Sequence, residues 1–336
     1  MIYVGGVPFA PDDSSQGMDT LIALMELPVL ASASNSFKSV PQKKLSVSEP
    51  ILPFVYLLSP LTLTFAIFPI LKLVGTDEAT TCVGVVIRNC KSGMLSVAHI
   101  DSPNIVDVGL TQMLSSVADQ DADDLLDVHL IGGFDDISSQ HSRVDKKNRT
   151  EMEGFSYPLC AKIIETLRNR SEKFQIQTLH VLGHNTKWDS QGVGSPVFLG
   201  FVVETATGSI IPASFDRSSK CPDEIVRRVR ITSWYDDPSW TGKLLDAYDT
   251  KTDRFVIAPC AWSIRQKEMA LTLQNLSDTE ILLKCSTSPS AECPHFVDNE
   301  RRMWDYLIRH PDWRETFPSK QPRVFERNAD GTWTKL

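Results

Sequence analysis

The sequence predicts an α+β fold: a mixed, mostly antiparallel sheet or sandwich with flanking helices. Candidate strands and helices follow one another along the 336 residues without the strict alternation that a parallel sheet requires. Several candidate strands are joined by short turns, which is typical of hairpins. We find no internal repeat, Walker motif or dinucleotide-binding fingerprint. We therefore treat residues 1–336 as a single domain.

The composition is that of an ordinary globular protein, with 42% hydrophobic and 23% charged residues. The formal net charge is −8, and no basic cluster stands out against it. Nucleic-acid binders need a positive surface to meet phosphates, so this class is not expected. An acidic balance is compatible with a substrate that carries a positive α-amino group.

The cysteines do not form a recognisable scaffold or metal site. There are seven of them, with no CxxC pair, so neither a disulfide framework nor a paired-CxxC zinc site is expected. Cys285, Cys293 and His295 come nearest to a metal cluster, but a fourth ligand is not evident nearby. We expect no metal and no cofactor. Reduced thiols and the lack of a secretory signal predict a cytoplasmic protein, with a nuclear pool as an alternative.

The first 50 residues predict little regular structure. Residues 1–7 alternate apolar and small side chains, as an edge strand does, and residues 20–25 suit a short helix. Residues 31–48 are small and polar, with Lys43 and Lys44 among them, and predict an exposed loop.

Residues 51–71 form an anomalous run of 21 residues without a charge, inside an atypical apolar segment that spans residues 51–73. Length and apolarity make the run a candidate transmembrane helix. Pro53, Pro60 and Pro69 argue against a helix, because each removes a helical hydrogen bond. Short buried strands broken by proline fit the run equally well, and we expect no membrane partner.

A predicted hairpin lies at the centre of the chain. Residues 82–87 are rich in β-branched side chains, residues 91–93 form a turn, and residues 94–100 form a second strand. Antiparallel pairing places the start of the first strand beside the end of the second. Those two ends carry Cys82 and His99.

A thiol beside an imidazole is a candidate nucleophile with its base. The preceding loop, from Thr76 to Thr81, can supply a hydroxyl that orients the histidine, backbone N–H groups for an oxyanion, and carboxylates for a cationic substrate. The alternative is a buried apolar cysteine beside a structural histidine. His129 is the rival base, although its place within an apolar run favours a core role.

The rest of the chain continues the mixed pattern. The glycine pair Gly132-Gly133 ends a strand and is either a wall of a pocket or a plain turn. Residues 135–157 are polar and charged and predict a flexible insertion. The other predicted elements are helices at residues 104–119, 158–167, 222–229 and 297–309, strands at residues 126–131, 174–182 and 197–205, and hairpins at residues 197–215, 243–258 and 324–335.

Several motifs together resemble the protein N-terminal asparagine amidohydrolases. The matching pieces are residues 77–82 (DEATTC), His99 with Asp101, residues 127–134 (DVHLIGGF), residues 213–215 (ASF), residues 286–289 (STSP) and residues 294–297 (PHFV). The opening residues 1–9 (MIYVGGVPF) resemble the plant branch of this family. The resemblance covers nearly the whole chain, and residues 51–71 depart from the more polar segment of the family. The spacing of Thr76, Cys82 and His99 is also similar to that in the chemotaxis receptor deamidases.

The resemblance implies an activity and a site. The side-chain amide of an N-terminal asparagine would be hydrolysed to aspartate and ammonia, a step of the N-degron pathway that leads to ubiquitin-dependent protein catabolism. Cys82 is the implied nucleophile, His99 its base, and Thr76 the residue that orients the imidazole. Candidate substrate-binding residues are Asp77, Glu78, Thr81, Asp101, Ser286 and Ser288. The implied partners are peptides or proteins with an N-terminal asparagine.

Two other functions stay open. One is a cysteine hydrolase of different specificity, such as a peptidase or a glutamine-directed deamidase. The other is a non-catalytic peptide-binding module whose active loop was disturbed by the apolar run before it.

Overall fold

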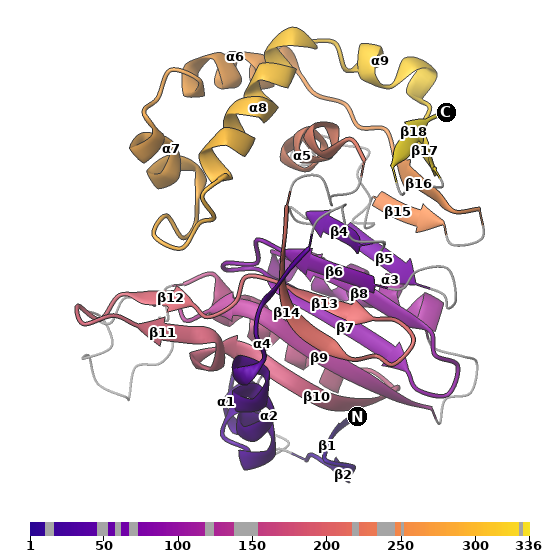
Figure 1. Cartoon of the computed structure of the whole chain (residues 1–336), viewed down its shortest axis with the longest axis vertical. Helices are drawn as coiled ribbons and strands as arrows, with labels where there is room; N and C mark the ends of the chain where they lie inside the picture. Colours follow the sequence, from indigo (N-terminus) through magenta and orange to yellow (C-terminus); the bar gives the residue numbers. More distant parts are fainter. Residues whose placement is uncertain are drawn as a thin grey trace.

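Two β-sheets packed face to face, with helices on the outside, build the molecule in the computed structural model (Figure 1). The structure describes residues 1–10, 17–45, 53–57, 62–66, 73–117, 124–137, 154–216, 222–233, 246–249, 252–328 and 332–336. Within these residues there are nine α-helices, and most neighbouring strands are antiparallel without closing into a barrel. The predicted α+β class is confirmed.

The larger sheet has eleven strands and carries the predicted central hairpin. In spatial order the strands are β18 (Trp333–Lys335), β17 (Arg323–Arg327), β16 (Arg254–Ile257), β15 (Asp246–Asp249), β5 (Thr62–Ala66), β8 (Leu95–Ile100), β7 (Val83–Asn89), β9 (Leu125–Phe134), β10 (Lys173–Leu182), β1 (Ile2–Val4) and β2 (Val7–Pro8). The pairs β15/β5, β9/β10 and β10/β1 are parallel, and the other neighbours are antiparallel. The predicted hairpins at residues 82–100, 243–258 and 324–335 all form.

The smaller sheet has five strands and lies in front of β7 and β9 in Figure 1. Its spatial order is β3 (Lys43–Leu45), β14 (Ile210–Phe215), β13 (Phe201–Glu204), β6 (Leu73–Asp77) and β4 (Pro53–Leu57). A separate two-stranded ribbon consists of β11 (Thr186–Trp188) and β12 (Gly194–Pro196). The predicted hairpin at residues 197–215 corresponds to β13 and β14.

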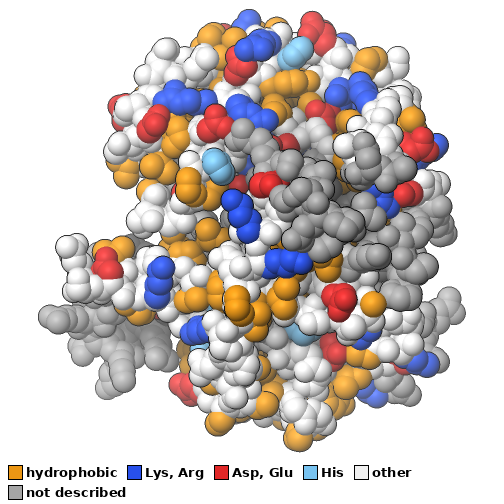
Figure 2. Space-filling view, in the orientation of Figure 1, with side chains coloured by type: hydrophobic (Ala, Val, Ile, Leu, Met, Phe, Trp, Pro, Cys, Tyr) orange, Lys and Arg blue, Asp and Glu red, His pale blue; other side chains and the backbone are white. Residues whose placement is uncertain are grey.

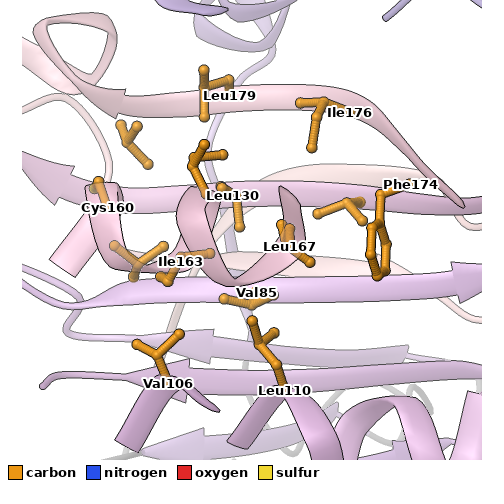
Figure 3. Close-up of a cluster of buried hydrophobic side chains, with 14 of the residues drawn as sticks. Val85, Val106, Leu110, Leu130, Cys160, Ile163, Leu167, Phe174, Ile176 and Leu179 are labelled. Carbon is orange, nitrogen blue, oxygen red and sulfur yellow. The ribbon is translucent and has the colours of Figure 1, made fainter. Parts of the chain in front are cut away.

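Helices α1 (Gly17–Met25), α3 (Val106–Val117) and α4 (Ser156–Arg168) cover the face of the larger sheet that the smaller sheet leaves open. Helix α2 (Pro28–Ser39) packs beside β10, and its Phe37 belongs to the core on the smaller-sheet side. Figure 3 shows Val106 and Leu110 of α3, and Ile163 and Leu167 of α4, against Val85 of β7. Side chains alternate along a strand, so odd-numbered residues of β7 face these helices and even-numbered ones face the smaller sheet.

The C-terminal third adds a helical layer at one end of the sheets (Figure 1). Its helices are α5 (Glu224–Ser233), α6 (Ile264–Leu273), α7 (Asp278–Cys285), α8 (Phe296–Arg309) and α9 (Trp313–Thr316). Their apolar faces share one core with the side of the two sheets that carries Val86 and Phe201. On the face in Figure 2, acidic and basic side chains are interspersed over this layer.

The loop prediction for residues 31–48 is wrong for residues 31–39, which belong to α2, and for residues 43–45, which form β3, while residues 46–48 lie outside the described part. Pro28 occupies the first turn of α2, where the missing N–H costs nothing. Leu30 and Phe37 are buried on one face of the helix. The small polar residues at other positions of α2 are compatible with this burial. Tertiary packing here outweighs a weak local signal.

The apolar run 51–71 contains strands where the structure describes it. Residues 53–57 and 62–66 are β4 and β5, and the other residues of the run lie outside the described part. Among described residues, no single helix has the length and apolarity to cross a membrane; only α1 and α2 taken together do, and they meet at a bend of 67°. Of the predicted insertion, residues 138–153 also lie outside the described part.

Candidate active site

The hairpin β7–β8 brings Cys82 and His99 to the same end of the larger sheet's central strand pair. Val83 pairs with Ile100 and Gly84 with His99, so Cys82 directly precedes the paired stretch. Gly84, two residues after Cys82, lies opposite His99. The cysteine and the histidine are therefore at the same end of the hairpin, as antiparallel pairing predicts.

The smaller sheet supplies a third member of this group. Thr76 lies on β6, and its Oγ1 is 2.8 Å from Nδ1 of His99, within hydrogen-bonding distance. The sheets come this close because Gly84 has no side chain: a Cβ there would lie 2.3 Å from Cε1 of Phe201 and 3.0 Å from Cγ2 of Thr76. The missing side chain lets Thr76 reach the imidazole from the opposite sheet.

His99 is held so that its second nitrogen is available. The residue is 1% exposed, and its Nε2 is buried without a hydrogen-bond partner in the described part of the chain. When Nδ1 donates to Thr76, Nε2 carries the lone pair that a general base uses. Burial lowers the pKa of His99 to about 4, partly opposed by the charge of Glu78, so the imidazole is neutral near pH 7.

His129 is poorly placed to act on Cys82. It lies on β9 opposite Val86, which is four residues along β7 from Cys82, or about 13 Å at the usual strand rise. Its Nδ1 is 3.0 Å from the Thr178 hydroxyl, and burial lowers its pKa to about 4. The core interpretation of His129 fits this placement.

The Cys82 thiol is protonated in the resting protein. Burial raises its pKa well above the ordinary value, and the carboxylates of Asp101 and Glu292 raise it further, against a hydrogen bond with Thr81 that lowers it. The side chain nevertheless stays partly exposed. A thiol in this setting becomes nucleophilic only by giving its proton to a base as it attacks.

Backbone contacts fix the loop that carries Cys82. The carbonyl of Cys82 accepts a 2.7 Å hydrogen bond from Gly133 N–H, and the carbonyl of Thr80 accepts one of 3.1 Å from Phe134. Gly132 has φ +119°, and a Cβ there would lie 2.6 Å from the Cys82 carbonyl oxygen. The predicted glycine pair therefore allows close backbone approach to the nucleophile loop, while β9 continues through it to Phe134.

The candidate carboxylates differ in what already surrounds them. Asp77 is 7% exposed and accepts hydrogen bonds from the backbone N–H groups of Glu78 and Phe215. Glu78 forms an ion pair of 2.9 Å with Arg228 of α5. Asp101 has a buried Oδ1 with no partner among described residues, and burial raises its pKa to about 7. Of the three, Asp101 has the most unused bonding capacity beside Cys82.

Sequence reasoning missed Glu292, whose charge acts on the Cys82 thiol. The Ser286 hydroxyl donates to Glu292 over 2.5 Å, and burial raises the pKa of this carboxyl. No local pattern links Glu292 to a cysteine so far away in sequence. Only its position six residues after Ser286, in a segment already singled out, could have drawn attention to it.

The loop at residues 286–289 does approach the nucleophile loop. Thr287 Oγ1 is 2.9 Å from Thr81 Oγ1. The loop that carries the candidate substrate-binding residues Ser286 and Ser288 therefore contacts Thr81, another candidate. The Ser286 hydroxyl also accepts a hydrogen bond from the N–H of Ser288, which is 5% exposed. Beside this contact is a pocket of about 220 Å³, lined by residues 134–137, 192–194 and 287–290.

The described residues contain no group of three or more His, Cys, Asp or Glu side chains that could hold a metal ion. Cys285, Cys293 and His295 all lie within this part of the chain.

Comparison with known proteins gives the same family throughout. The model of the family described as protein N-terminal asparagine amidohydrolase matches residues 66–335. The chain is 52% identical to the protein N-terminal asparagine amidohydrolase of Arabidopsis thaliana, over the full length of both chains. It is 29% identical to the Mus musculus protein of the same name, over 79% of this chain and 78% of the relative, and 28% identical to the Homo sapiens one over the same shares.

Proposed function

Because the chain belongs to the protein N-terminal asparagine amidohydrolase family, whose members are hydrolases of amide C–N bonds, we propose that it deamidates N-terminal asparagine. The side-chain amide becomes a carboxylate, and ammonia leaves. The observation that carries this proposal is the position of His99, which contacts Thr76 and pairs with Gly84, two residues after Cys82. One imidazole nitrogen is within hydrogen-bonding distance of the hydroxyl, and the other is buried without a partner among the described residues.

The first half of the reaction forms a thioester. As the Cys82 sulfur attacks the amide carbon, Nε2 of His99 takes the thiol proton. The negative charge on the amide oxygen is then held by backbone N–H groups around Thr81 and Cys82, a contribution of about 2.7–4 kcal/mol per donor in comparable sites. The C–N bond breaks, and the imidazolium returns the proton to the departing ammonia.

The second half restores the thiol. His99 removes a proton from water, which attacks the thioester carbon. The C–S bond breaks to give the side-chain carboxylic acid of aspartate, which releases its proton to solvent, and the sulfur regains a proton from the imidazolium. Thr76 keeps the imidazole in one tautomer through both halves, because its hydroxyl accepts from Nδ1–H.

Recognition of a free N-terminus is assigned to Asp101. An α-ammonium is best bound by a carboxylate through charge-assisted hydrogen bonds. Asp101 follows β8 directly after His99 and Ile100, and its Oδ1 is buried without a partner in the part of the chain that the structure describes. Glu292 adds a second negative charge near Cys82. A buried carboxyl gains its strongest available partner when an ammonium binds, which favours a charged chain end over a blocked one.

A panel of short peptides tests the function. The account expects ammonia release, with conversion of Asn to Asp detected by mass spectrometry, from peptides that begin with Asn. Peptides that begin with Gln, or with N-acetylated Asn, should react far more slowly. Preference for Gln would indicate a glutamine-directed deamidase, and release of the first residue would indicate a peptidase. Tight peptide binding without turnover would support the binding-module alternative.

The cellular setting is part of the same proposal. A free, catalytic thiol requires a reducing compartment, so we assign the enzyme to the cytoplasm, with a nuclear pool as an alternative. Its product exposes an N-terminal aspartate, the kind of chain end that the N-degron pathway reads. Fractionation of cells that express the tagged chain, combined with the turnover of an Asn-initiated reporter protein, tests both statements.

A further inference from the structure

The nucleophile loop contains a strained residue next to the catalytic group. Glu78 has φ +60°, the left-handed region that side chains other than glycine rarely adopt. Its N–H donates to the Asp77 carboxylate over 2.8 Å, and its carbonyl accepts from Thr80 N–H over 3.1 Å. The chain turns here between β6, which carries Thr76, and the loop that carries Cys82. An unusual backbone conformation persists only where neighbouring contacts hold it.

A contact from the C-terminal layer holds this turn. Arg228 Nη2 on α5 lies 2.9 Å from Glu78 Oε2, across 150 residues of sequence. Both side chains are largely buried, at 11% and 17% exposed. Glu224, one turn earlier on α5, accepts from Arg228 Nε at 3.2 Å, and Arg302 of α8 approaches Glu224 at 3.3 Å. Glu224, on the same helix, thus holds the Arg228 guanidinium in the orientation that pairs with Glu78 of the loop.

We propose that Arg228 is a positioning residue for the deamidation: through its ion pair with Glu78 it fixes the left-handed turn and so sets Cys82 against His99. This inference rests on the proposed function, which supplies the reaction. It also assigns Glu78 a different role from substrate binding, since the carboxylate is already paired with a buried guanidinium that a substrate ammonium would have to displace.

The charges around the pair support this assignment. The negative charge of Glu78 raises the pKa of His99 against the larger effect of burial. Glu300, which is close enough for Arg228 and Glu78 to act on its carboxyl, has its pKa raised to about 7 by burial. Several buried carboxylates therefore lie close to Arg228, and its removal would disturb both the turn and the local charge balance.

The test compares Arg228→Lys, Glu78→Ala, Glu78→Gln and the double variant Arg228→Lys with Glu78→Ala. Lysine keeps the charge but loses the planar fork, and glutamine keeps an acceptor but loses the charge. Arg301→Lys is the matched control, because Arg301 forms an inter-helix ion pair of 2.7 Å with Asp278 and donates hydrogen bonds to the carbonyls of Gln274 and Leu276. Two rates are measured: kcat and KM for an Asn-initiated peptide, and alkylation of Cys82 by iodoacetamide.

We expect Glu78→Ala and Arg228→Lys to lower kcat about tenfold to a hundredfold, with KM nearly unchanged, as misplacement of a reacting group does. Glu78→Gln should retain more activity than Glu78→Ala, and Arg228→Lys should have no added effect in the Glu78→Ala background. Cys82 alkylation should slow in the same order, and the Arg301→Lys control should match the parent.

Three results would overturn the proposal. Additive effects in the double variant would mean that Arg228 does not act through Glu78. A rise in KM at unchanged kcat in the Glu78 variants would indicate that Glu78 binds the substrate. Parent-like alkylation and kcat in folded variants would remove the positioning role. Because alkylation needs no substrate, a parent protein without amidase activity would count against the proposed function alone.

Discussion

Thr76 and His99 lie on different sheets, yet the Thr76 hydroxyl is 2.8 Å from Nδ1 of His99. The contact crosses the interface between the sheets at Gly84, where the space of a missing side chain is filled by Phe201 and Thr76 itself. The orientation of the base is therefore a property of how the two sheets pack. The hairpin brings His99 and Cys82 to the same end of two paired strands, but it does not determine the orientation of the imidazole.

Replacement of Thr76 tests the orienting role. Thr76→Val preserves shape but leaves Nδ1 of a buried imidazole unpaired, which should cost about 1–3 kcal/mol of unfolding free energy. The kcat should fall about a hundredfold, at the low end of what a general base contributes. Thr76→Ser keeps the hydroxyl and should retain most activity. Equal activity in the valine and serine variants, measured by ammonia release, would remove the orienting role.

Gly84→Ala tests the close approach of the sheets. Its methyl group would lie 2.3 Å from Phe201, a fully buried ring, so the sheets or the ring must shift. Overpacking of this kind costs about 1–3 kcal/mol. Urea unfolding should show that loss, and kcat should drop with it because Thr76 moves away from His99. Gly93→Ala, at the exposed turn of the same hairpin, is a control for backbone effects: it has φ +75° but open space around it.

The pH dependence of kcat/KM tests Asp101. Burial raises its pKa to about 7, so the carboxyl is protonated below that pH and ionised above it. An ammonium binds only the ionised form, so kcat/KM should rise with pH through about 7. It should fall again as the substrate α-amino group loses its proton, at about 7.7–8.0.

Asp101→Asn supplies the matching variant. It should lower kcat/KM mainly through KM, and the rise through pH 7 should disappear. If Asp101→Asn keeps the parent pH profile, another residue causes the rise in kcat/KM and binds the substrate α-amino group. Glu292→Gln is then the next variant to measure, because Glu292 is the other carboxylate that acts on Cys82.

A buried pair outside the site tests the account of the core. Ser34 Oγ on α2 lies 2.7 Å from Nδ1 of His180 on β10, and the imidazole packs against Phe37 and Phe198. Burial lowers the pKa of His180 to about 3, so it is neutral in the folded protein. Ser34→Ala should cost about 1–3 kcal/mol in urea unfolding at pH 7 and leave kcat unchanged. No loss of stability would show that the hydroxyl is dispensable.

The local parts of the fold could be predicted from sequence. The central hairpin, α3, α8 and the last hairpin have strong periodicity and clear turn residues, and each forms within a few residues of its predicted bounds. Cys82 and His99 could be paired by hairpin geometry, but the roles of Thr76 and the substrate-binding candidates came from family resemblance. Their assignment stays a prediction, since the structure places these residues without testing their chemistry.

The parts that depend on distant contacts could not be predicted. Glu292 and Arg228 reach the nucleophile loop across 150 residues or more, and neither lies in a pattern that indicates this. Helices α6 and α7 are a different case, because their starting signals are local: Ser263 with Gln266, and Ser277 with Glu280, form capping boxes that can be read from the sequence. α2 was missed because its small polar residues resemble a loop until its buried face is known.

The most direct test of the central claim is ammonia release from an Asn-initiated peptide by Cys82→Ala, beside the parent and Cys90→Ala. Cys90 is an exposed cysteine at the turn after β7 and controls for loss of a thiol. The account predicts that Cys82→Ala folds like the parent and releases no ammonia above background, while Cys90→Ala keeps parental activity. Full activity in Cys82→Ala would contradict the account, because no step proposed here can proceed without that sulfur.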